Sequence, residues 1–560
     1  NKQGMFFSRG SQELRDDLII PGTTVLVGEG KEITGLGLAN TKENSDIILF
    51  PQPSSDPNDP LNWAQWRKVL HFIVLFFFST IVAAAVNFDG PIYDVMAETY
   101  NCSYNELNTG GGIAWLFIAI SCLLCQEVAA KIGRRPIYLF STILAIISGI
   151  IFVTRRTFAG YIGFSIVNGF SAGPVDSLVE VSIADVFFLH EHGKFIGVYL
   201  ISNGIGSSFG PFLAGYIYEY LGWLWCGYMV IIICGGLFVA EFFLLEESFY
   251  VRHYETDEIV EEKLLKVVLS NKSHDHEGEL YSDKAESNKK LNFNVDEIAC
   301  SDVDNNQRVK ISKDIKPKTY MELLKPFIIT ENRISILSIL KNLIVLRYPA
   351  VTWAAIVYGL QMCWLSLITV SQSEFFQAPP YNFSADALGL LNLSITVGNT
   401  IGGIYAAFSD KFVIYMSQKN GGVFEPEFRL LMNIVPLVLN IGGLFMYGLG
   451  PLYGAPWIVA AIGIALISFG ICTTTSLAVT YVLECYPGET VQTMTSVLVV
   501  RNLLATVFTF VFQYWLDGVG VLGTTIMLAC FCLVSSGSYI IMYWNGKAAR
   551  KYTMKWYSPS

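Results

Sequence analysis

The chain has 560 residues, of which 52% are hydrophobic and only 15% are charged, whereas an ordinary soluble domain carries about 25% charged residues. This composition excludes a soluble globular protein and indicates a membrane protein. The net charge of −10 is concentrated in the first residues and in a central polar segment, so it says little about partners and gives no indication of nucleic-acid binding.

Apolar residues gather into twelve runs, each near the ~20 residues of helix that cross a bilayer. Six runs precede the polar segment and six follow it. The pattern predicts an all-α membrane protein with twelve transmembrane helices in two six-helix bundles. The predicted spans are 68–97, 108–130, 136–154, 159–183, 194–219, 226–246, 349–376, 386–409, 430–449, 456–483, 493–515 and 521–544.

The soluble parts are expected to be tails and one linker. The first two-thirds of the linker is too charged to pack a core, and its later part, ending in ILSILKNLI, alternates basic and apolar residues as a helix on the membrane surface does. The expected divisions are a cytosolic tail at 1–66, a bundle at 67–246, the linker at 247–348, a second bundle at 349–546 and a cytosolic tail at 547–560.

Lysine and arginine in the short loops predict the orientation. Almost all of them fall on one side if the N-terminus is cytosolic, so the positive-inside rule places both termini in the cytosol. Asn101 in NCS and Asn382 in NFS then face outward as candidate glycosylation sites. Most of the eleven cysteines lie inside spans, and the spacing leaves open whether Cys102 and Cys226 are bonded.

The sequence motifs do not support an enzyme or a nucleotide-driven pump. A nucleotide-driven pump would need a G-x-x-x-x-G-K-[ST] loop, which the chain lacks. The six histidines include no H-x-x-x-H pair inside a span. We therefore expect no enzymatic activity, no cofactor and no metal.

Small residues at four-residue spacing line one face of the fifth span and one face of the eighth. Such stripes let another helix approach closely, and Pro211 permits a bend in the fifth span. Because one stripe lies in each half, we expect the halves to rock against each other there. The stripes are Ser202, Gly206, Gly210 and Ala214, and Gly398, Gly402 and Ala406.

Ionisable residues at membrane depth cost about 2.5–3.5 kcal/mol each on insertion scales and usually serve function. Asp176 and Glu180 are four residues apart on one helix face, so they are expected to share a proton and to couple transport to protons. Arg501 must either pair with one of these acids or hold an anionic group of the substrate. The first arrangement selects a cation and the second an anion, and both stay open.

Polar and aromatic residues on several spans are expected to complete a substrate pocket. Rings can hold a cation or an apolar body. The predicted substrate-binding residues are Asn87, Asp89, Asp176, Tyr358, Gln361, Trp364, Gln372, Arg501 and Asn502.

Several motifs resemble those of the major facilitator superfamily. GIGSSFGPFLAG (204–215) is similar to its fifth-helix antiporter signature, and KIGRRPIYLF (131–140) to its loop between helices two and three. DPNDPLNWAQWRK (56–68) and DVFFLHEHGK (185–194) resemble fungal drug:proton antiporters. With FEPEFRL (424–430) and LECYPG (483–488), the closest resemblance is to the branch of the yeast high-affinity polyamine importer.

This resemblance implies the major facilitator fold, one central site and alternating access. The sequence also departs from the pattern: Ala130 occupies the usual Asp position of the loop motif, Ser165 replaces a frequent Arg, and Met362 and Ser373 stand where the polyamine importer has acids. The residues expected to act in gating are Gly206, Gly210, Pro211, Arg134, Arg135, Asp185, Asp410 and Glu484.

Together these features predict a proton-coupled secondary active transporter for a small polar organic solute, with an organic cation such as a polyamine ahead. The alternatives are an organic anion, an amino sugar or multidrug efflux, and, in another class, a non-transporting nutrient sensor. The partners expected are the substrate, the proton and membrane lipid. We expect a monomer in a fungal plasma membrane, with the vacuolar membrane as the alternative.

Overall fold

The computed structural model describes residues 20–25, 56–188, 191–250, 322, 342–376, 381–420 and 423–557. Everything below concerns these residues. The predicted surface helix near the end of the linker lies outside them, apart from residues 322 and 342–348.

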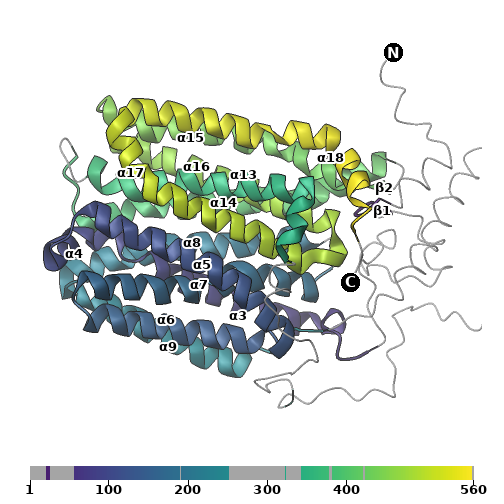
Figure 1. The fold of residues 1–560 in the computed structure, drawn as a ribbon, viewed down its shortest axis with the longest axis horizontal. Coiled ribbons are helices and arrows are strands. Elements are labelled where there is room, and N and C mark those ends of the chain that lie inside the picture. The colour runs from purple at the N-terminus through teal and green to yellow at the C-terminus, as the bar shows by residue number, and fades with distance from the viewer. Residues whose placement is uncertain are drawn as a thin grey trace, which may run out of the picture.

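The first half of the chain forms long helices that run side by side (Figure 1). Pro91 and Gly90 end the first long helix early, and a short 3-10 turn and a short helix carry the chain to the next one. The elements are η1 (Pro60–Asn62), α3 (Gln65–Asn87), η2 (Gly90–Ile92), α4 (Tyr93–Tyr100), α5 (Tyr104–Ile132), α6 (Arg135–Thr154), α7 (Phe158–Val186), α8 (His192–Leu221) and α9 (Leu224–Leu244).

The second half repeats this arrangement. α17 covers the eleventh predicted span and most of the twelfth, which continues into α18. The two spans are separated at Gly520, where the backbone leaves the helical conformation with a φ of 76° that suits glycine. The elements are η5 (Leu343–Arg347), α13 (Pro349–Phe376), α14 (Ala385–Lys419), β2 (Val423–Phe424), η6 (Pro426–Asn433), α15 (Ile434–Leu452), α16 (Trp457–Cys485), η7 (Pro487–Glu489), α17 (Thr490–Gly537) and α18 (Tyr539–Thr553).

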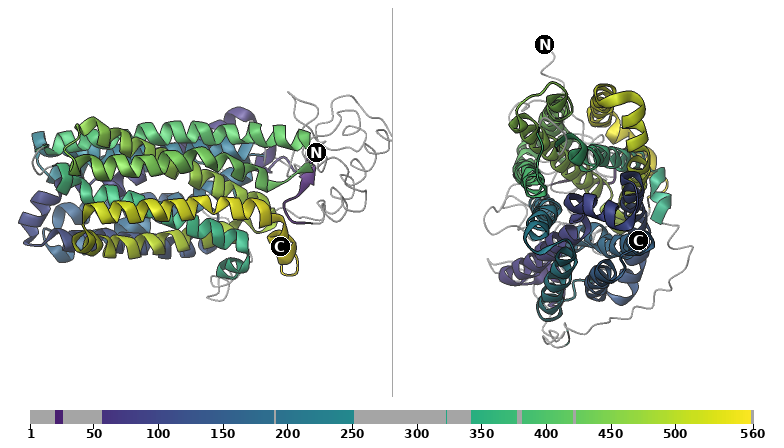
Figure 2. Two further views of the ribbon diagram at one scale, coloured as in Figure 1. Left: turned by 90° about the horizontal axis from the view of Figure 1, so that it is seen from above. Right: turned by 90° about the vertical axis from the view of Figure 1, so that its left-hand side faces the viewer.

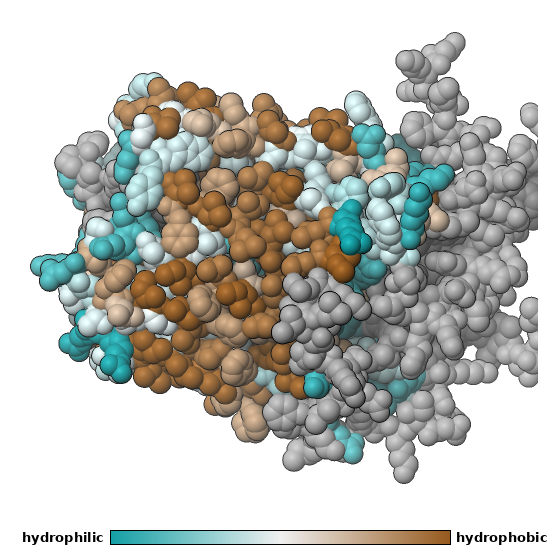
Figure 3. All heavy atoms as spheres, viewed as in Figure 1, coloured by the Kyte–Doolittle hydropathy of each residue, from teal (hydrophilic) through white to brown (hydrophobic). Residues whose placement is uncertain are grey.

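The twelve-helix, all-α architecture predicted from the apolar runs is confirmed. Nine helices in the described residues are long and apolar enough to cross a membrane by composition alone. The helices α7 and α8 are not among these nine, and α13 contributes a shorter apolar stretch, Pro349–Leu365; all three lie among the others (Figure 2). Apolar side chains form a broad belt on the outer face (Figure 3).

Both described ends of the chain lie at one end of the bundle, which we call the terminus side (Figure 1). There β1 (Thr24–Val25), from the N-terminal tail, pairs antiparallel with β2. The opposite end, the far side, carries α4 and the chain reversal at Gly520.

The glycine stripes pack inside each half, which corrects the expectation that they meet between the halves. A Cβ atom at Gly206 would overlap the carbonyl oxygen of Thr80 on α3, and one at Gly210 would overlap that of Ala84. In the second half, Gly398 and Gly402 lie in the same way against α16. The stripes therefore bring α8 to α3 and α14 to α16.

A different face of α8 and α14 forms the contact between the halves. A Cβ atom at Gly197 would lie 3.0 Å from the carbonyl oxygen of Gly403, and one at Gly403 would lie 2.9 Å from that of Gly197. Nearer the far side, Gly389 lies against the backbone of Phe212, the residue after Pro211. We call this contact the α8–α14 seam.

Gly206→Leu should destabilise the first half, because the added side chain would meet the backbone of α3, which cannot rotate away. Overpacking of this kind typically costs about 1–3 kcal/mol. We expect a lower midpoint of thermal unfolding in detergent. Gly235→Leu is the matched control, since nothing lies within 4 Å of a Cβ atom there; equal midpoints for the two variants would contradict the packing assigned to Gly206.

Candidate functional site

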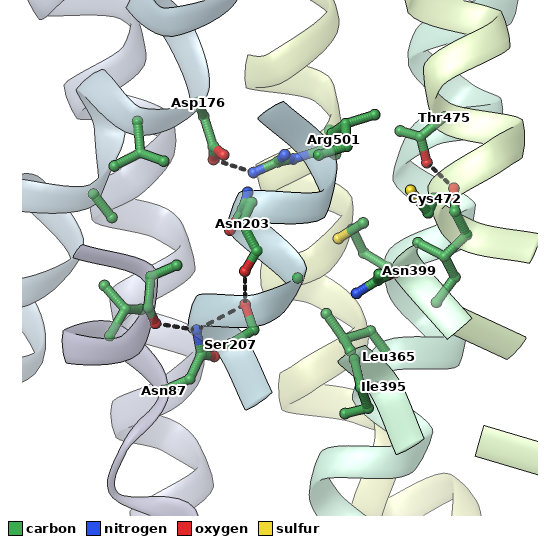
Figure 4. A pocket seen from close by; sticks show the side chains of 18 of the residues that line it. Asn87, Asp176, Asn203, Ser207, Leu365, Ile395, Asn399, Cys472, Thr475 and Arg501 are labelled. Carbon is green, nitrogen blue, oxygen red and sulfur yellow. Dashed lines mark hydrogen bonds and ion pairs between the residues drawn. The ribbon is translucent and has the colours of Figure 1, made fainter. Parts of the chain in front are cut away.

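A cavity of about 130 Å³ lies between the two halves, near the middle of the helices. Helices α3, α5, α7 and α8 line it from the first half, and α13, α14, α16 and α17 from the second. Its walls are largely apolar, and its polar groups gather in two places (Figure 4). The polar and aromatic lining residues are Asn87, Trp115, Asp176, Asn203, Ser207, Tyr358, Asn399, Ser468, Thr475 and Arg501.

Arg501 on α17 joins the halves at one end of this cavity. Its guanidinium forms an ion pair with the carboxylate of Asp176 on α7. Nη1 donates to the Tyr358 hydroxyl at 2.8 Å, and Nε and Nη2 donate to Asn502 Oδ1 at 3.0 and 2.7 Å. The guanidinium carbon also lies 5.9 Å from the centre of the Trp115 ring. A buried guanidinium is stable only with such partners.

Glu180 lies one helical turn from Asp176 toward the terminus side and is 1% exposed. Neither of its carboxylate oxygens has a hydrogen-bond partner among the described residues. Glu180 does not line the cavity itself. The structure thus places the two acids of the sequence prediction in unlike surroundings, one paired and one alone.

Amide and hydroxyl groups of both halves supply the second polar region. Asn87 Nδ2 donates to the Ala83 carbonyl at 2.8 Å and lies 3.5 Å from Ser207 Oγ, which donates to the Asn203 carbonyl. Asn399 faces them from α14 (Figure 4). Asn203, Ser207 and Asn399 were not predicted from the sequence. The sequence pattern that could have indicated two of them is the i, i+4 spacing of Asn203 and Ser207 within the glycine-rich stretch.

Several residues predicted to bind substrate lie elsewhere. Gln361 Oε1 accepts from Trp364 Nε1 at 2.8 Å and from Asn440 Nδ2 at 3.1 Å, so these side chains hold the second half together. Asp89 accepts from the Tyr161 hydroxyl at 3.1 Å, away from the cavity lining. Gln372 is buried but does not line the cavity, and Asn502 reaches it only through Arg501.

Charged residues predicted to act in gating form two clusters on the terminus side. In the first half, Arg134 pairs with Asp185, and Glu247 accepts the backbone N–H groups of Arg134 and Arg135 at 2.9 and 3.1 Å. Glu247 thereby satisfies the open donors at the start of α6. It was not predicted, because it lies more than a hundred residues away in sequence.

The second cluster connects the halves. Arg429 on η6 donates to Asp410 at 2.9 Å and to Glu484 at 2.5 Å. Asp410 also accepts the backbone N–H of Lys194, in the first turn of α8, at 3.0 Å. A carboxylate at a helix N-terminus is favourable. We call the contact between Asp410 and Lys194 the terminus-side gate.

The two sequon asparagines and the two cysteines whose pairing the sequence left open lie at the far-side ends of the helices. Asn101 and Asn382 are exposed on the far side and adopt left-handed backbone conformations, with φ of 52° and 47°. Cys102 and Cys226 are both free thiols, and Cys226 Sγ donates to the Ala214 carbonyl at 3.5 Å.

The sequence model of the Major Facilitator Superfamily matches residues 72–509 of this chain. The chain belongs to that superfamily. It is 30% identical over 558 residues to an uncharacterized MFS-type transporter of Schizosaccharomyces pombe, covering 96% of this chain and 94% of the relative. It is also 30% identical over 554 residues to Protein HOL1 of Saccharomyces cerevisiae, covering 93% of each.

Solved structures agree with the fold of this superfamily member. The human organic anion transporter MFSD10 matches with a TM-score of 0.54 at 13% identity, over 84% of this chain and 99% of that one. The xylose transporter XylE from E. coli matches with a TM-score of 0.54 at 13% identity, over 86% and 98%. Its membership of the superfamily makes the protein a multi-pass membrane transporter for small molecules rather than an enzyme.

Removing Asp176 alone should destabilise the protein, because Arg501 would stay charged and buried without its carboxylate. Breaking a buried pair in this way costs about 3–5 kcal/mol. We expect Asp176→Leu to lower the midpoint of thermal unfolding, and Asp176→Leu with Arg501→Met to recover most of it. If the double variant is no more stable than the single one, the pair does not hold the halves together.

Proposed function

We propose that the protein is a proton-coupled secondary transporter that carries a small organic cation through the cavity by alternating access. The observation that carries this proposal is the pairing of Arg501 with Asp176. Arg501 is the only Lys or Arg among the described residues that line the cavity. Since its charge is already matched, the cavity offers no free cation to an anionic substrate.

The rest of the cavity suits a cation. The side-chain oxygens of Asn87, Asn203 and Asn399 can accept its N–H groups. These amides lie apart from the rings of Trp115 and Tyr358, which already face the Arg501 guanidinium. The volume, about 130 Å³, is close to the ~150 Å³ cavity that holds one benzene molecule. This size favours a short cation over a long one.

Family resemblance supports the same substrate class. The motifs named above resemble those of the polyamine-importer branch of the fungal drug:proton antiporters. Met362, at a position where that importer has an acid, lines the cavity with a neutral thioether. We therefore propose a cation with one or two charges rather than a long polyamine.

Glu180 is proposed as the proton site. A carboxyl group buried without a partner is stable in its neutral form, so Glu180 would take up a proton readily and release it only when its surroundings change. Asp176 would also take part in proton uptake and release, because it would exchange its partner when Arg501 moves. The amino sugar, efflux and sensor alternatives have no comparable observation in their favour.

Charge distribution and exposed sequons support a plasma-membrane protein with both termini in the cytosol. The basic loops lie on the terminus side, and the sequon residues Asn101 and Asn382 are exposed on the far side as candidate glycosylation sites. We propose that the terminus side faces the cytosol.

An organic anion is the second candidate. Arg501 lines the cavity, and it could leave Asp176 for a carboxylate on the substrate once Asp176 is protonated. MFSD10, an organic anion transporter, shares the fold, although a likeness at this identity carries the fold alone. The two candidates differ in what Arg501 does during transport.

Glu180→Gln should make uptake insensitive to an imposed pH gradient, because a side-chain amide carries no titratable proton. Substrate-for-substrate exchange should continue, since that step moves no net proton. The measurement is uptake into proteoliposomes with and without the gradient. Glu241→Gln is the matched control: Glu241 is fully buried, accepts from Thr142 at 2.8 Å and lies on α9, away from the cavity. An unchanged pH response in Glu180→Gln would place the proton site elsewhere.

Uptake of a panel of size-matched solutes decides whether the substrate is a cation or an anion. We expect a short alkyl diamine or monoamine to be taken up, and a short dicarboxylate and an amino sugar to be excluded. Arg501→Lys should retain cation uptake within about tenfold, because lysine keeps the pair with Asp176 although it lacks the planar fork. Selective dicarboxylate uptake that Arg501→Lys abolishes would establish the anion instead.

A further inference from the structure

Residues 20–25 of the N-terminal tail lie on the second half of the molecule, although the tail leads into α3 of the first half. Thr24 and Val25 pair with Phe424 and Val423 in the two-stranded sheet at the terminus side (Figure 1). Ile20 and Thr23 are only 3% and 4% exposed. We call residues 20–25 the docked tail; it is packed as part of the second half.

A buried arginine on α18 holds the docked tail. Arg550 is fully buried, and its Nη1 donates to the Pro21 carbonyl at 2.6 Å and to Thr23 Oγ1 at 2.9 Å. Its Nε and Nη2 donate to the carboxylate of Glu427 on η6 at 2.9 and 2.7 Å. Without the tail, the donors at Nη1 would lose their partners.

Gly22 places the docked tail directly against α16. It has a φ of 80°, which favours glycine, and a Cβ atom there would overlap the carbonyl oxygen of Glu484. The tail therefore touches the backbone of the residue whose carboxylate holds Arg429. Any larger side chain at position 22 would push the tail away from α16.

A continuous set of contacts runs from the docked tail to the first half. Gly22 packs on Glu484, Glu484 pairs with Arg429, Arg429 pairs with Asp410, and Asp410 accepts the backbone N–H of Lys194. We propose that the docked tail stabilises the closed terminus-side gate, and that its release favours the conformation open on that side. The surface formed by β2, η6, α18 and the end of α16 is thus a regulatory docking surface, and its partner is the chain's own residues 20–25.

A native thiol can report the opening. Cys472 lines the cavity and is 4% exposed, so a polar maleimide added on the terminus side should modify it only when that side is open. The rate is read by mass spectrometry of the peptide that contains Cys472. This test follows opening of the cavity rather than uptake, so its outcome does not depend on the substrate proposed above.

Gly22→Val should raise the rate of Cys472 modification from the terminus side several-fold. Gly454→Val is the matched control, since Gly454 also has a positive φ, 66°, but nothing lies within 4 Å of a Cβ atom there. Hydrogen exchange at the amides of Thr24 and Val25 confirms release of the tail. Deletion of residues 1–25, which removes the docked tail outright, should have the same effect. A wild-type Cys472 rate in the deletion variant overturns the proposal.

The opposite change should hold the gate closed. Val25 and Val423 lie directly across the two strands, where Cα atoms are about 4.5–5.5 Å apart, a separation that a disulfide spans. In Val25→Cys with Val423→Cys, oxidation should slow Cys472 modification several-fold, and a reductant should restore it. An oxidised variant with the wild-type rate also overturns the proposal.

Discussion

A buried ion pair between the two halves governs what the cavity can do. Arg501 belongs to the second half and Asp176 to the first, and neither charge can leave its partner in an apolar interior without a large cost. A transporter that alternates has to separate or reorient such groups in each cycle. Whatever replaces one partner at that moment, whether a proton, a substrate or another side chain, is thereby coupled to the movement.

The contacts around this ion pair fix its geometry as well as stabilising it. Tyr358 accepts from Nη1 of Arg501, and Asn502 accepts from Nε and Nη2, so these contacts fix the orientation of the guanidinium. Glu180, one turn away, is left with no hydrogen-bond partner among the described residues. The contrast between a paired and an unpartnered carboxyl group, one turn apart on α7, is the observation on which the proposed proton coupling rests.

The sequence predicted the architecture, and it gave pairing with Asp176 or Glu180 as one of two arrangements open to Arg501, for physical reasons that hold at the level of single helices. Apolar runs of bilayer length specify spans, and an arginine at membrane depth needs an acid at the same depth. The amide region was harder to predict. Asn203 and Asn399 are on different halves, and only the packing of α8 against α14 turns both toward one space. Gln361 and Trp364 show the reverse error: their helix borders the cavity, but their own faces point into the second half.

The glycines of α8 divide by face between two tasks. Gly206 and Gly210 fix α8 to α3 within one half, while Gly197 meets Gly403 across the α8–α14 seam. At the seam a Cβ atom on either glycine would press on the carbonyl oxygen of the other. The separation of α8 and α14 is therefore set by backbone atoms on both helices, so a side chain added at either position would widen the surface along which the two halves meet.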